Sequence, residues 1–213
     1  YGFFKSTYYV KSSCFTRLEN AVELTFEKPM GFTLGGSGYV YICIPWITKW
    51  EWHPFSVYQH PDREERVCIC VSVAGDWTKK LHEMVHLPTQ RPVWISGPFP
   101  SPFHTAVDFD NTISVASGIG ITPALCACEE YADTRAMHLI WTCRDASLVE
   151  FVVDNCLHRE STMDAWTMIC YTGKRQLLFR GEIPNNVLLF KGRPDLEALI
   201  VSVIKASETG NGP

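Results

Sequence analysis

The residues best suited to bind a charged ligand lie in a glycine turn at residues 115–123, V-A-S-G-I-G-I-T-P. A short apolar segment leads into Gly118 and Gly120, and Thr122 and Pro123 fall in the first turn of an expected helix. Glycines permit positive φ and a close approach to the backbone, and the helix start offers free N–H groups to a phosphate. The pattern indicates a dinucleotide-binding turn in which Pro123 replaces the usual third glycine. An ordinary strand-to-helix turn is the alternative.

Aromatic and hydrogen-bonding side chains are combined at residues 50–56, W-E-W-H-P-F-S. At the edge of a strand, His53, Pro54, Phe55 and Ser56 would present a flat surface for a ring, with hydrogen-bonding groups beside it. The alternative is an aromatic core cluster next to a turn.

A second phosphate-binding helix start is indicated at residues 75–78, G-D-W-T. Gly75 precedes the expected helix, and Trp77 and Thr78 lie in its first turn. Simple capping of the helix by Asp76 is the alternative.

The nine cysteines are scattered, with C-x-C pairs at Cys68/Cys70 and Cys126/Cys128. No C-x-x-C occurs, and no histidine stands at zinc-ligand spacing from either pair. We therefore expect no metal site, and we interpret most cysteines as small core residues in a reducing compartment.

Two patterns of secondary structure position these motifs. The first part of the chain is typical of a small antiparallel β-barrel, with one helix whose Leu81, Met84 and Val85 share a face, and with strands expected at residues 21–26, 39–44, 67–73 and 93–96. The second part alternates strands (112–116, 137–142, 166–171) with helices (123–132, 146–158, 194–206). That alternation predicts a parallel sheet with right-handed crossovers. No strand follows the last helix, so this sheet is expected to lack its last strand.

Composition narrows the class of protein. The 213 residues are 46% hydrophobic and 20% charged, which suits a folded globular chain. The net charge is −4 and no basic cluster is long enough to follow a phosphate backbone, so nucleic acid is not an expected partner. The most apolar stretch, residues 40–47, is far shorter than the roughly 20 residues of a transmembrane helix. Because the sequence starts at Tyr1, we expect a piece of a longer protein.

In this order, the motifs resemble the dehydrogenase domain of NADPH oxidases and ferric reductases, within the ferredoxin-NADP reductase superfamily. The resemblance covers residues 10–206. E-W-H-P-F-S is similar to the flavin motif, G-D-W-T to the flavin pyrophosphate segment, and residues 115–123 to the NADPH phosphate loop. Further similarities are the G-P-F turn at residues 97–99, W-T-C-R-D at 141–145, T-G at 172–173 and G-R-P at 192–194.

The resemblance implies an antiparallel FAD-binding β-barrel at residues 1–104 and a Rossmann-like parallel α/β NADP-binding domain at residues 105–213. For FAD it implies contacts from His53, Pro54, Phe55, Ser56, Gly75, Trp77 and Thr78, with Ser56 near flavin N5 and Phe55 beside the ring. For NADPH it implies Gly118, Gly120, Thr122 and Pro123 at the pyrophosphate and Cys143 near the nicotinamide. Arg144 is the candidate for the 2′-phosphate, since a guanidinium binds phosphate bidentately, and Lys174 and Arg175 are weaker candidates. A surface ion pair of Arg144 with Asp145 or Glu150 is the alternative.

The implied activity is hydride transfer from NADPH to FAD, followed by single-electron transfer to a haem-containing membrane domain of the same or a partner chain. Such a module acts at the cytosolic face of a membrane, with regulatory or other complex subunits as further partners. The hydride step needs no side-chain acid, base or nucleophile, so no catalytic side chain is expected. The terminal acceptor is oxygen or Fe(III). The residues of the W-H-P-F and G-D-W-T motifs favour the oxidase branch.

Four departures from the family pattern bear on this interpretation. Tyr58 and Gln59 are bulky where a hydroxyl is usual, and Pro100 ends the G-P-F turn. Ser72 replaces a basic residue, which removes a charge-assisted hydrogen bond of roughly 1–3 kcal/mol to FAD. The Cys-Gly-Pro of the last strand and the C-terminal aromatic residue are missing. These departures favour two alternatives, a weak flavin site and a non-catalytic structural or interaction subunit that keeps the fold. A free soluble flavin reductase is a further alternative.

Overall fold

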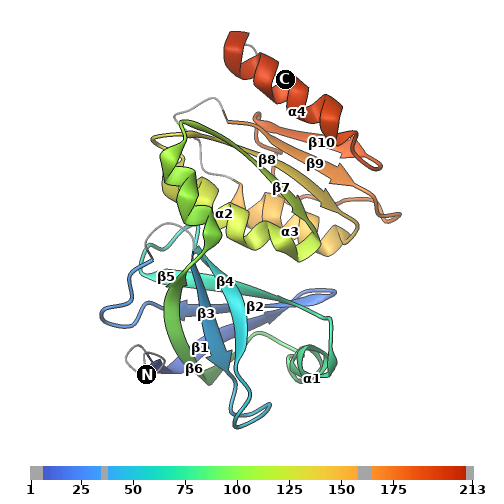
Figure 1. Cartoon of the computed structure of the whole chain (residues 1–213). Coiled ribbons are helices and arrows are strands. Elements are labelled where there is room, and N and C mark those ends of the chain that lie inside the picture. Colours follow the sequence, from blue (N-terminus) through green and yellow to red (C-terminus); the bar gives the residue numbers. More distant parts are fainter. Residues whose placement is uncertain (1–6, 35–37, 158–164, 210–213) are drawn as a thin grey trace. The chain divides into compact units, whose positions relative to one another are not determined.

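The computed structural model describes residues 7–34, 38–157 and 165–209. The chain divides into two compact units, Tyr1–His104 and Thr105–Pro213 (Figure 1). Each unit has its own sheet and its own core, so each is described separately.

The first unit is a closed barrel of six strands in the order β1-β2-β5-β4-β3-β6, and every neighbouring pair is antiparallel. The strands are β1 (Thr7–Arg17), β2 (Ala21–Glu27), β3 (Gly38–Cys43), β4 (His53–Gln59), β5 (Arg66–Ser72) and β6 (Thr89–Pro100). The antiparallel barrel predicted from the sequence is confirmed.

Alternation along the strands separates the barrel core from its outer face. On β2, Val22, Leu24 and Phe26 are almost fully buried and join the core, whereas Glu23 and Thr25 point the other way. The same alternation on β4 divides the aromatic and polar motif between two faces. This division decides which motif residues meet.

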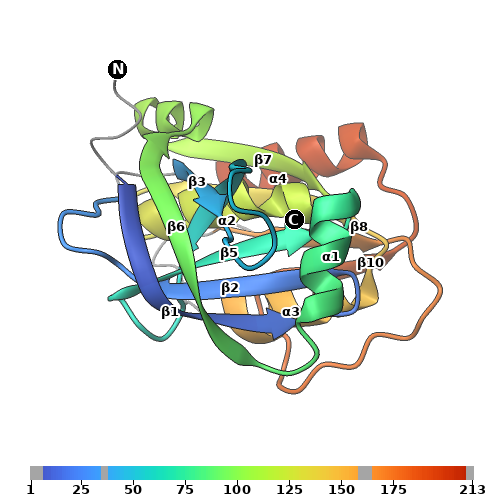
Figure 2. The same ribbon diagram turned by 90° about the horizontal axis from the view of Figure 1, so that it is seen from below.

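Helix α1 (Asp76–Met84) packs against the barrel (Figure 2). Leu81 and Val85 enter the barrel core, but Met84 is 36% exposed, so the predicted three-residue face holds for only two residues. Asp76 is not the capping residue, because Gly75 occupies the N-cap position. The Thr78 hydroxyl instead accepts hydrogen bonds from the Ala74 and Gly75 N–H groups at 2.8 and 2.9 Å.

The second unit is a parallel sheet in the order β10-β9-β8-β7. Its strands are β7 (Asn111–Ser117), β8 (Ala136–Cys143), β9 (Thr167–Tyr171) and β10 (Val187–Lys191), and its helices are α2 (Ile121–Tyr131), α3 (Ala146–Cys156) and α4 (Leu196–Thr209). Helices α2 and α3 cover one face of the sheet and α4 covers the other (Figure 1). Two short 3₁₀ helices, Pro102–Asp108 and Gly118–Gly120, lie on either side of β7.

Three strands were absent from the sequence prediction or were only implied by it. β1 and β10 were not predicted, and β4 was expected only as a strand edge. β10 pairs with β9 although residues 172–186 between them contain no helix or strand. Predicted helix 146–158 ends at Cys156, and residue 158 lies outside the described residues.

All nine cysteines are free thiols, and six of them are buried. The described part of the chain contains no group of three His, Cys, Asp or Glu side chains able to hold a metal ion. Among the same residues, no helix is both long enough and apolar enough to cross a bilayer.

Candidate functional site

The rim of the barrel brings together three aromatic rings from two elements. His53 and Phe55 lie on one face of β4, and both rings pack against Trp77 of α1. The His53 and Trp77 centroids are 4.3 Å apart, and Phe55 is stacked on Trp77 at 6.2 Å. All three side chains are half-buried, so part of each ring surface is accessible. The structure therefore joins two motifs that are separate in the sequence.

Helix α1 is held in this position by contacts with the loop between β3 and β4. The Trp77 indole N–H donates to the Thr48 hydroxyl at 3.3 Å, and the Lys80 ammonium donates to the Ile47 carbonyl at 3.0 Å. These contacts fix the orientation of the indole ring against His53 and Phe55.

Pro54 and Ser56 lie on the opposite, outer face of β4. Ser56 pairs with Tyr39 of β3, whose ring contacts Phe99 at 5.4 Å. Within the described residues the Ser56 hydroxyl makes no hydrogen bond, so it is available to a ligand. The structure therefore does not bring Ser56 together with His53 and Phe55 on one face.

Two departures from the family pattern have structural roles in the barrel. The Tyr58 hydroxyl donates to Glu23 Oε1 at 3.3 Å and so links β4 to β2. The Gln59 amide donates to the Arg63 and Arg66 carbonyls and closes the β4–β5 connection. Burial raises the pKa of the Glu23 carboxyl, and the Tyr58 and Cys68 hydrogen bonds oppose that rise.

The start of α1 leaves room for a ligand beside its backbone. A Cβ atom added to Gly75 would meet nothing within 4 Å. The Thr78 hydroxyl, however, already bonds to the Ala74 and Gly75 N–H groups and to the Gly75 carbonyl. Backbone N–H groups and the Trp77 ring are therefore the accessible groups here, more than the Thr78 hydroxyl.

In the second unit, the glycine turn after β7 is equally open. Gly118 has a φ of 51°, which only glycine adopts readily, and added Cβ atoms at Gly118 and Gly120 would meet nothing within 4 Å. The fully buried Trp141 holds the turn by donating its indole N–H to the Gly118 carbonyl at 2.8 Å. The Thr122 hydroxyl donates to the Ile119 carbonyl at 3.2 Å, and Pro123 stands in the first turn of α2. Backbone groups, more than side chains, form this turn.

Cys143 and Arg144 follow one another at the end of β8 but differ in exposure. Cys143 is 2% exposed and its thiol donates to the Asp145 carbonyl at 3.6 Å. Burial is the main cause that raises the Cys143 pKa to about 11, so this thiol stays protonated at neutral pH. The Arg144 side chain is exposed.

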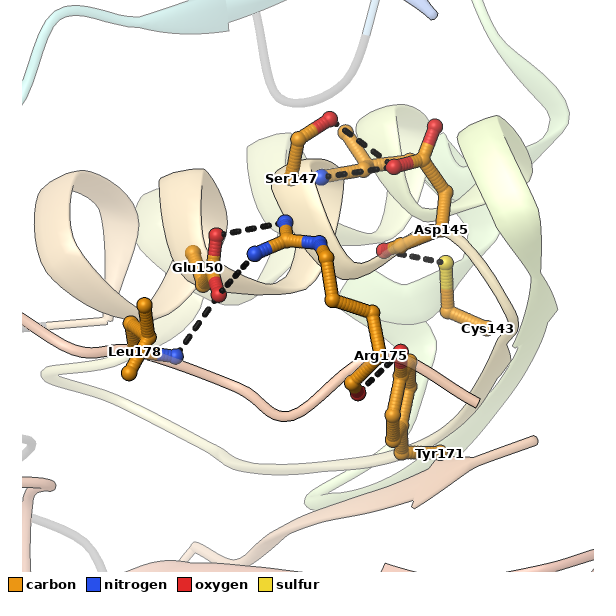
Figure 3. A network of polar contacts seen from close by, with 8 residues as sticks. Cys143, Asp145, Ser147, Glu150, Tyr171, Arg175 and Leu178 are labelled. Atoms are coloured by element: carbon orange, nitrogen blue, oxygen red, sulfur yellow. Dashed lines mark hydrogen bonds and ion pairs between the residues drawn. The ribbon is translucent and has the colours of Figure 1, made fainter. Parts of the chain in front are cut away.

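The carboxylates that offered an ion-pair alternative for Arg144 have other partners (Figure 3). Asp145 caps α3 by accepting from the Leu148 N–H and from the Ser147 hydroxyl. Glu150 binds Arg175 bidentately at 2.9 and 3.1 Å. Among the described residues Arg144 forms no ion pair, so its guanidinium is available to a ligand.

A pocket that the sequence did not predict lies at the carboxyl ends of β9 and β10. It has a volume of about 360 Å³ and is lined by Tyr171, Gly173, Lys174, Arg175, Gln176, Leu177, Leu189, Phe190 and Lys191. Carboxyl ends of parallel strands are the usual place for ligands in α/β sheets. The basic pair after T-G at residues 172–173 was the available sequence signal, but Lys191 comes from a strand that was not predicted.

The family of the chain is decided by residues 7–116, which match the model of a family described as an FAD-binding domain. The chain belongs to this FAD-binding family. It is 31% identical over 137 residues to NADPH oxidase 1 of Rattus norvegicus (58% of this chain, 24% of the relative) and 30% identical over 154 residues to NADPH oxidase 3 of Homo sapiens (64% and 27%). The chain thus spans about a quarter of the length of these curated relatives.

The fold of this chain is also similar to that of a solved reductase. A ferredoxin NADP+ reductase from Neisseria gonorrhoeae, with bound FAD and NADP, aligns with a TM-score of 0.58 at 13% identity, covering 94% of this chain and 79% of that one. The resemblance to NADPH oxidases, drawn from the motifs, is confirmed by the family match and by these relatives, and the similarity to the ferredoxin NADP+ reductase shows a shared fold.

The barrel residues fit the cofactor of this family. The half-buried rings of His53, Phe55 and Trp77 supply aromatic surface, the Ser56 hydroxyl lacks a protein partner among the described residues, and the space beside Gly75 is open. Ring surfaces suit an aromatic ring system and backbone N–H groups at a helix start suit a pyrophosphate, while the Ser56 hydroxyl is available on the other face of β4. FAD is therefore the cofactor of the barrel.

Proposed function

We propose that the chain is an NADPH-dependent flavin dehydrogenase module, in which hydride passes from NADPH to FAD and single electrons then pass to a haem-containing membrane domain. The observation that carries the proposal is one chain with two separate nucleotide-binding features. The first is an FAD-binding barrel, and the second is a parallel sheet whose glycine turn is open to a phosphate. FAD supplies the chemistry that converts a two-electron donor into one-electron steps. The protein supplies binding and orientation.

In the barrel, the ring surfaces of His53, Phe55 and Trp77 bind and orient the cofactor. Pro54 and the Ser56 hydroxyl lie on the other, outer face of β4, where they would contact a different part of the cofactor from the rings of His53 and Phe55. Backbone N–H groups after Gly75 bind the pyrophosphate, and Thr78 keeps that segment in place through its hydrogen bonds to Ala74 and Gly75.

In the parallel sheet, Gly118, Gly120 and the first turn of α2 at Thr122 and Pro123 bind the pyrophosphate of NADPH. The exposed Arg144 binds the 2′-phosphate. The pocket at β9 and β10 lies at the same edge of the sheet and adds Lys174 and Lys191. The buried Cys143, the last residue of β8 and the neighbour of Arg144 in sequence, contributes packing near the nicotinamide.

In this proposal each unit binds one cofactor: the barrel unit (residues 1–104) binds FAD and the sheet unit (residues 105–213) binds NADPH. The oxidase branch is favoured over the ferric reductase branch, because the curated relatives named above are NADPH oxidases. The proposed site of action is the cytosolic face of a membrane, with the haem domain in the same or a partner chain and with regulatory subunits as further partners.

The test has two stages on the purified chain. Titration with FAD is expected to give a protein-bound flavin with its visible absorption band. Addition of NADPH without oxygen is then expected to bleach that band faster than NADH does. A flavin-bound chain that neither nucleotide bleaches would contradict the proposal.

A non-catalytic structural or interaction subunit is the second candidate. Ser72 in place of a basic residue and the Thr78 hydroxyl already bonded to backbone groups favour it, since both weaken the FAD pyrophosphate site. A chain that stays colourless in excess FAD would support this candidate.

A further inference from the structure

One wall of the pocket at β9 and β10 is formed by the segment that connects these two strands, which contains no helix or strand. Residues 172–180 run from the end of β9 across the carboxyl edge of the sheet, and five of them line the pocket. A free segment of this kind populates many conformations, and ordering it costs conformational entropy whenever a ligand binds. In this structure, contacts at both ends of the segment hold it in place before any ligand binds.

The near end of this connection is fixed by hydrogen bonds to the ends of β8 and β9. The Thr172 N–H donates to the Cys143 carbonyl at 2.9 Å, and the Tyr171 hydroxyl donates to the Arg175 carbonyl at 2.8 Å. A Cβ atom at Gly173 would collide with the Tyr171 hydroxyl and with the Arg144 carbonyl. This end therefore packs tightly against the end of β8.

The far end is fixed by two carboxylates of α3, Glu150, whose contacts Figure 3 shows, and Asp154. Glu150 uses both oxygens: Oε1 accepts from the Leu178 N–H at 2.7 Å and from the Arg175 guanidinium at 3.1 Å, and Oε2 accepts from the same guanidinium at 2.9 Å. Asp154 accepts from the Arg180 N–H at 3.0 Å. The Glu150 side chain is 16% exposed and that of Arg175 is 43% exposed, so the pair is partly open to solvent and its strength comes from the bidentate geometry.

This arrangement also leaves the three basic side chains of the pocket in different states of pairing. Glu150 neutralises Arg175, whereas the ammonium groups of Lys174 and Lys191 have no ion pair within the described residues. The net positive charge left in the pocket lining therefore comes from the two lysines. A phosphate in the pocket would contact the two lysines, while Arg175 stabilises the pocket wall through its pair with Glu150.

We infer that Glu150 is a positioning residue for nucleotide binding: by holding Arg175 and the Leu178 N–H it fixes the pocket wall that presents Lys174 to the phosphate-bearing end of the nucleotide. Glu150 itself touches no ligand. The inference rests on the proposed function, because the occupant of the pocket is NADPH.

The test compares Glu150→Gln with Glu197→Gln. Glu197, in the first turn of α4, is exposed, and its side chain has no hydrogen bond or ion pair among the described residues, so its substitution controls for the loss of one negative charge. The probes are 2′-AMP and NADP+, titrated calorimetrically, with FAD binding and thermal melting measured alongside. We expect Glu150→Gln to weaken 2′-AMP and NADP+ binding about tenfold, the scale of one charge-assisted contact, and Glu197→Gln to leave both unchanged.

Kinetics on the FAD-loaded chain separate positioning from general damage. Glu150→Gln is expected to raise KM for NADPH while kcat stays near the wild-type value, because the group acts on binding alone. FAD affinity is expected to be unchanged in both variants. A fall in kcat with unchanged KM would overturn the inference.

A second variant keeps the inference testable when Glu150→Gln folds poorly. Arg175→Gln retains the Glu150 bond to the Leu178 N–H and removes the bidentate pair, and it is expected to weaken 2′-AMP binding about fivefold. The double variant is expected to be little worse than Glu150→Gln alone, since both residues act through one contact.

The outcomes distinguish the two levels of the argument. A wild-type chain that binds neither 2′-AMP nor NADP+ overturns the proposed NADPH role and this inference with it. A wild-type chain that binds both probes, with Glu150→Gln binding them equally well, overturns the inference alone. Tighter binding by Glu150→Gln also overturns it, because Glu150 would then be withholding Arg175 from the phosphate.

Discussion

The two regions proposed to bind nucleotides are built in different ways. At the barrel rim the contacts are made by side chains: the His53 and Phe55 rings both pack on Trp77, and Phe55 and Trp77 also pack against the barrel core. At the edge of the sheet, the groups open to a ligand belong to the backbone, because Gly118 and Gly120 face open space. Substitutions at the rim should therefore reduce stability and FAD binding together, whereas substitutions at the sheet edge should reduce nucleotide binding with less effect on stability.

The largest effect is expected for Trp77→Ala at the barrel rim. Removing the indole leaves the His53 and Phe55 rings without their partner, and we expect the free energy of unfolding to fall by about 2 kcal/mol, below the range for fully buried tryptophans. FAD binding should weaken in parallel. Chemical denaturation and flavin absorption measure the two effects.

The matched control for that substitution is Trp50→Ala. Trp50 is 87% exposed, so its loss should change stability by less than about 0.5 kcal/mol. Equal destabilisation by the two substitutions would show that the ring cluster does not stabilise the barrel.

At the sheet edge, Gly173→Ala is expected to have the next largest effect. The new methyl group collides with the Tyr171 hydroxyl and the Arg144 carbonyl, so the pocket wall must move. We expect NADP+ binding to weaken by more than about tenfold in calorimetry, while FAD binding in the barrel is unchanged. Unchanged NADP+ affinity would remove this wall from the nucleotide site.

A smaller and more selective effect is expected for Arg144→Ala. Loss of the guanidinium should weaken NADP+ binding about tenfold and leave NAD+ within about twofold, because only NADP+ carries the 2′-phosphate. Arg63→Ala, an exposed arginine of the barrel, is the control. Equal losses for NADP+ and NAD+ would remove Arg144 from the 2′-phosphate role.

The smallest effect concerns pH and the second unit. His138 is 1% exposed, accepts the Trp166 N–H at its Nδ1 atom and contacts the Ser207 hydroxyl through Nε2. Burial lowers the His138 pKa below its ordinary value of 6.5. The unfolded chain therefore binds the proton more readily, so the stability contribution is fully present above pH 6.5 and falls as the pH drops from there toward the folded pKa.

Denaturant unfolding of the chain between pH 7.5 and pH 5 tests this, with His138→Gln as the reference that cannot titrate. The native chain should lose more stability across that interval than the variant does. Identical pH profiles would show that His138 is not the group responsible.

The sequence predicted elements with regular alternation and missed elements without it. Residues 21–26 alternate clearly, and β2 was found where expected. β10 was missed because its apolar run, residues 187–190, has only four residues and does not alternate with polar ones, so periodicity alone does not identify it as a strand. β1 was missed because its N-terminal half mixes polar and exposed aromatic residues.

The candidate site was predictable where it is contiguous in sequence. The glycine turn and the motif at residues 50–56 each lie on a single short segment. The packing of His53 and Phe55 on Trp77, and the pairing of Glu150 with Arg175 25 residues away, depend on tertiary contacts that no local pattern encodes. The pocket escaped prediction for the same reason, since Lys174 and Lys191 meet only through the β9–β10 pair.

The most direct test of the central claim uses stereospecifically deuterated NADPH. If the chain aligns the nicotinamide with the flavin for direct hydride transfer, the FAD-loaded chain, with ferricyanide as one-electron acceptor, should oxidise NADPH with a primary isotope effect for one deuterated face only. A chain that binds FAD and NADP+ but oxidises NADPH without any isotope effect at saturating acceptor, or not at all, would contradict the account.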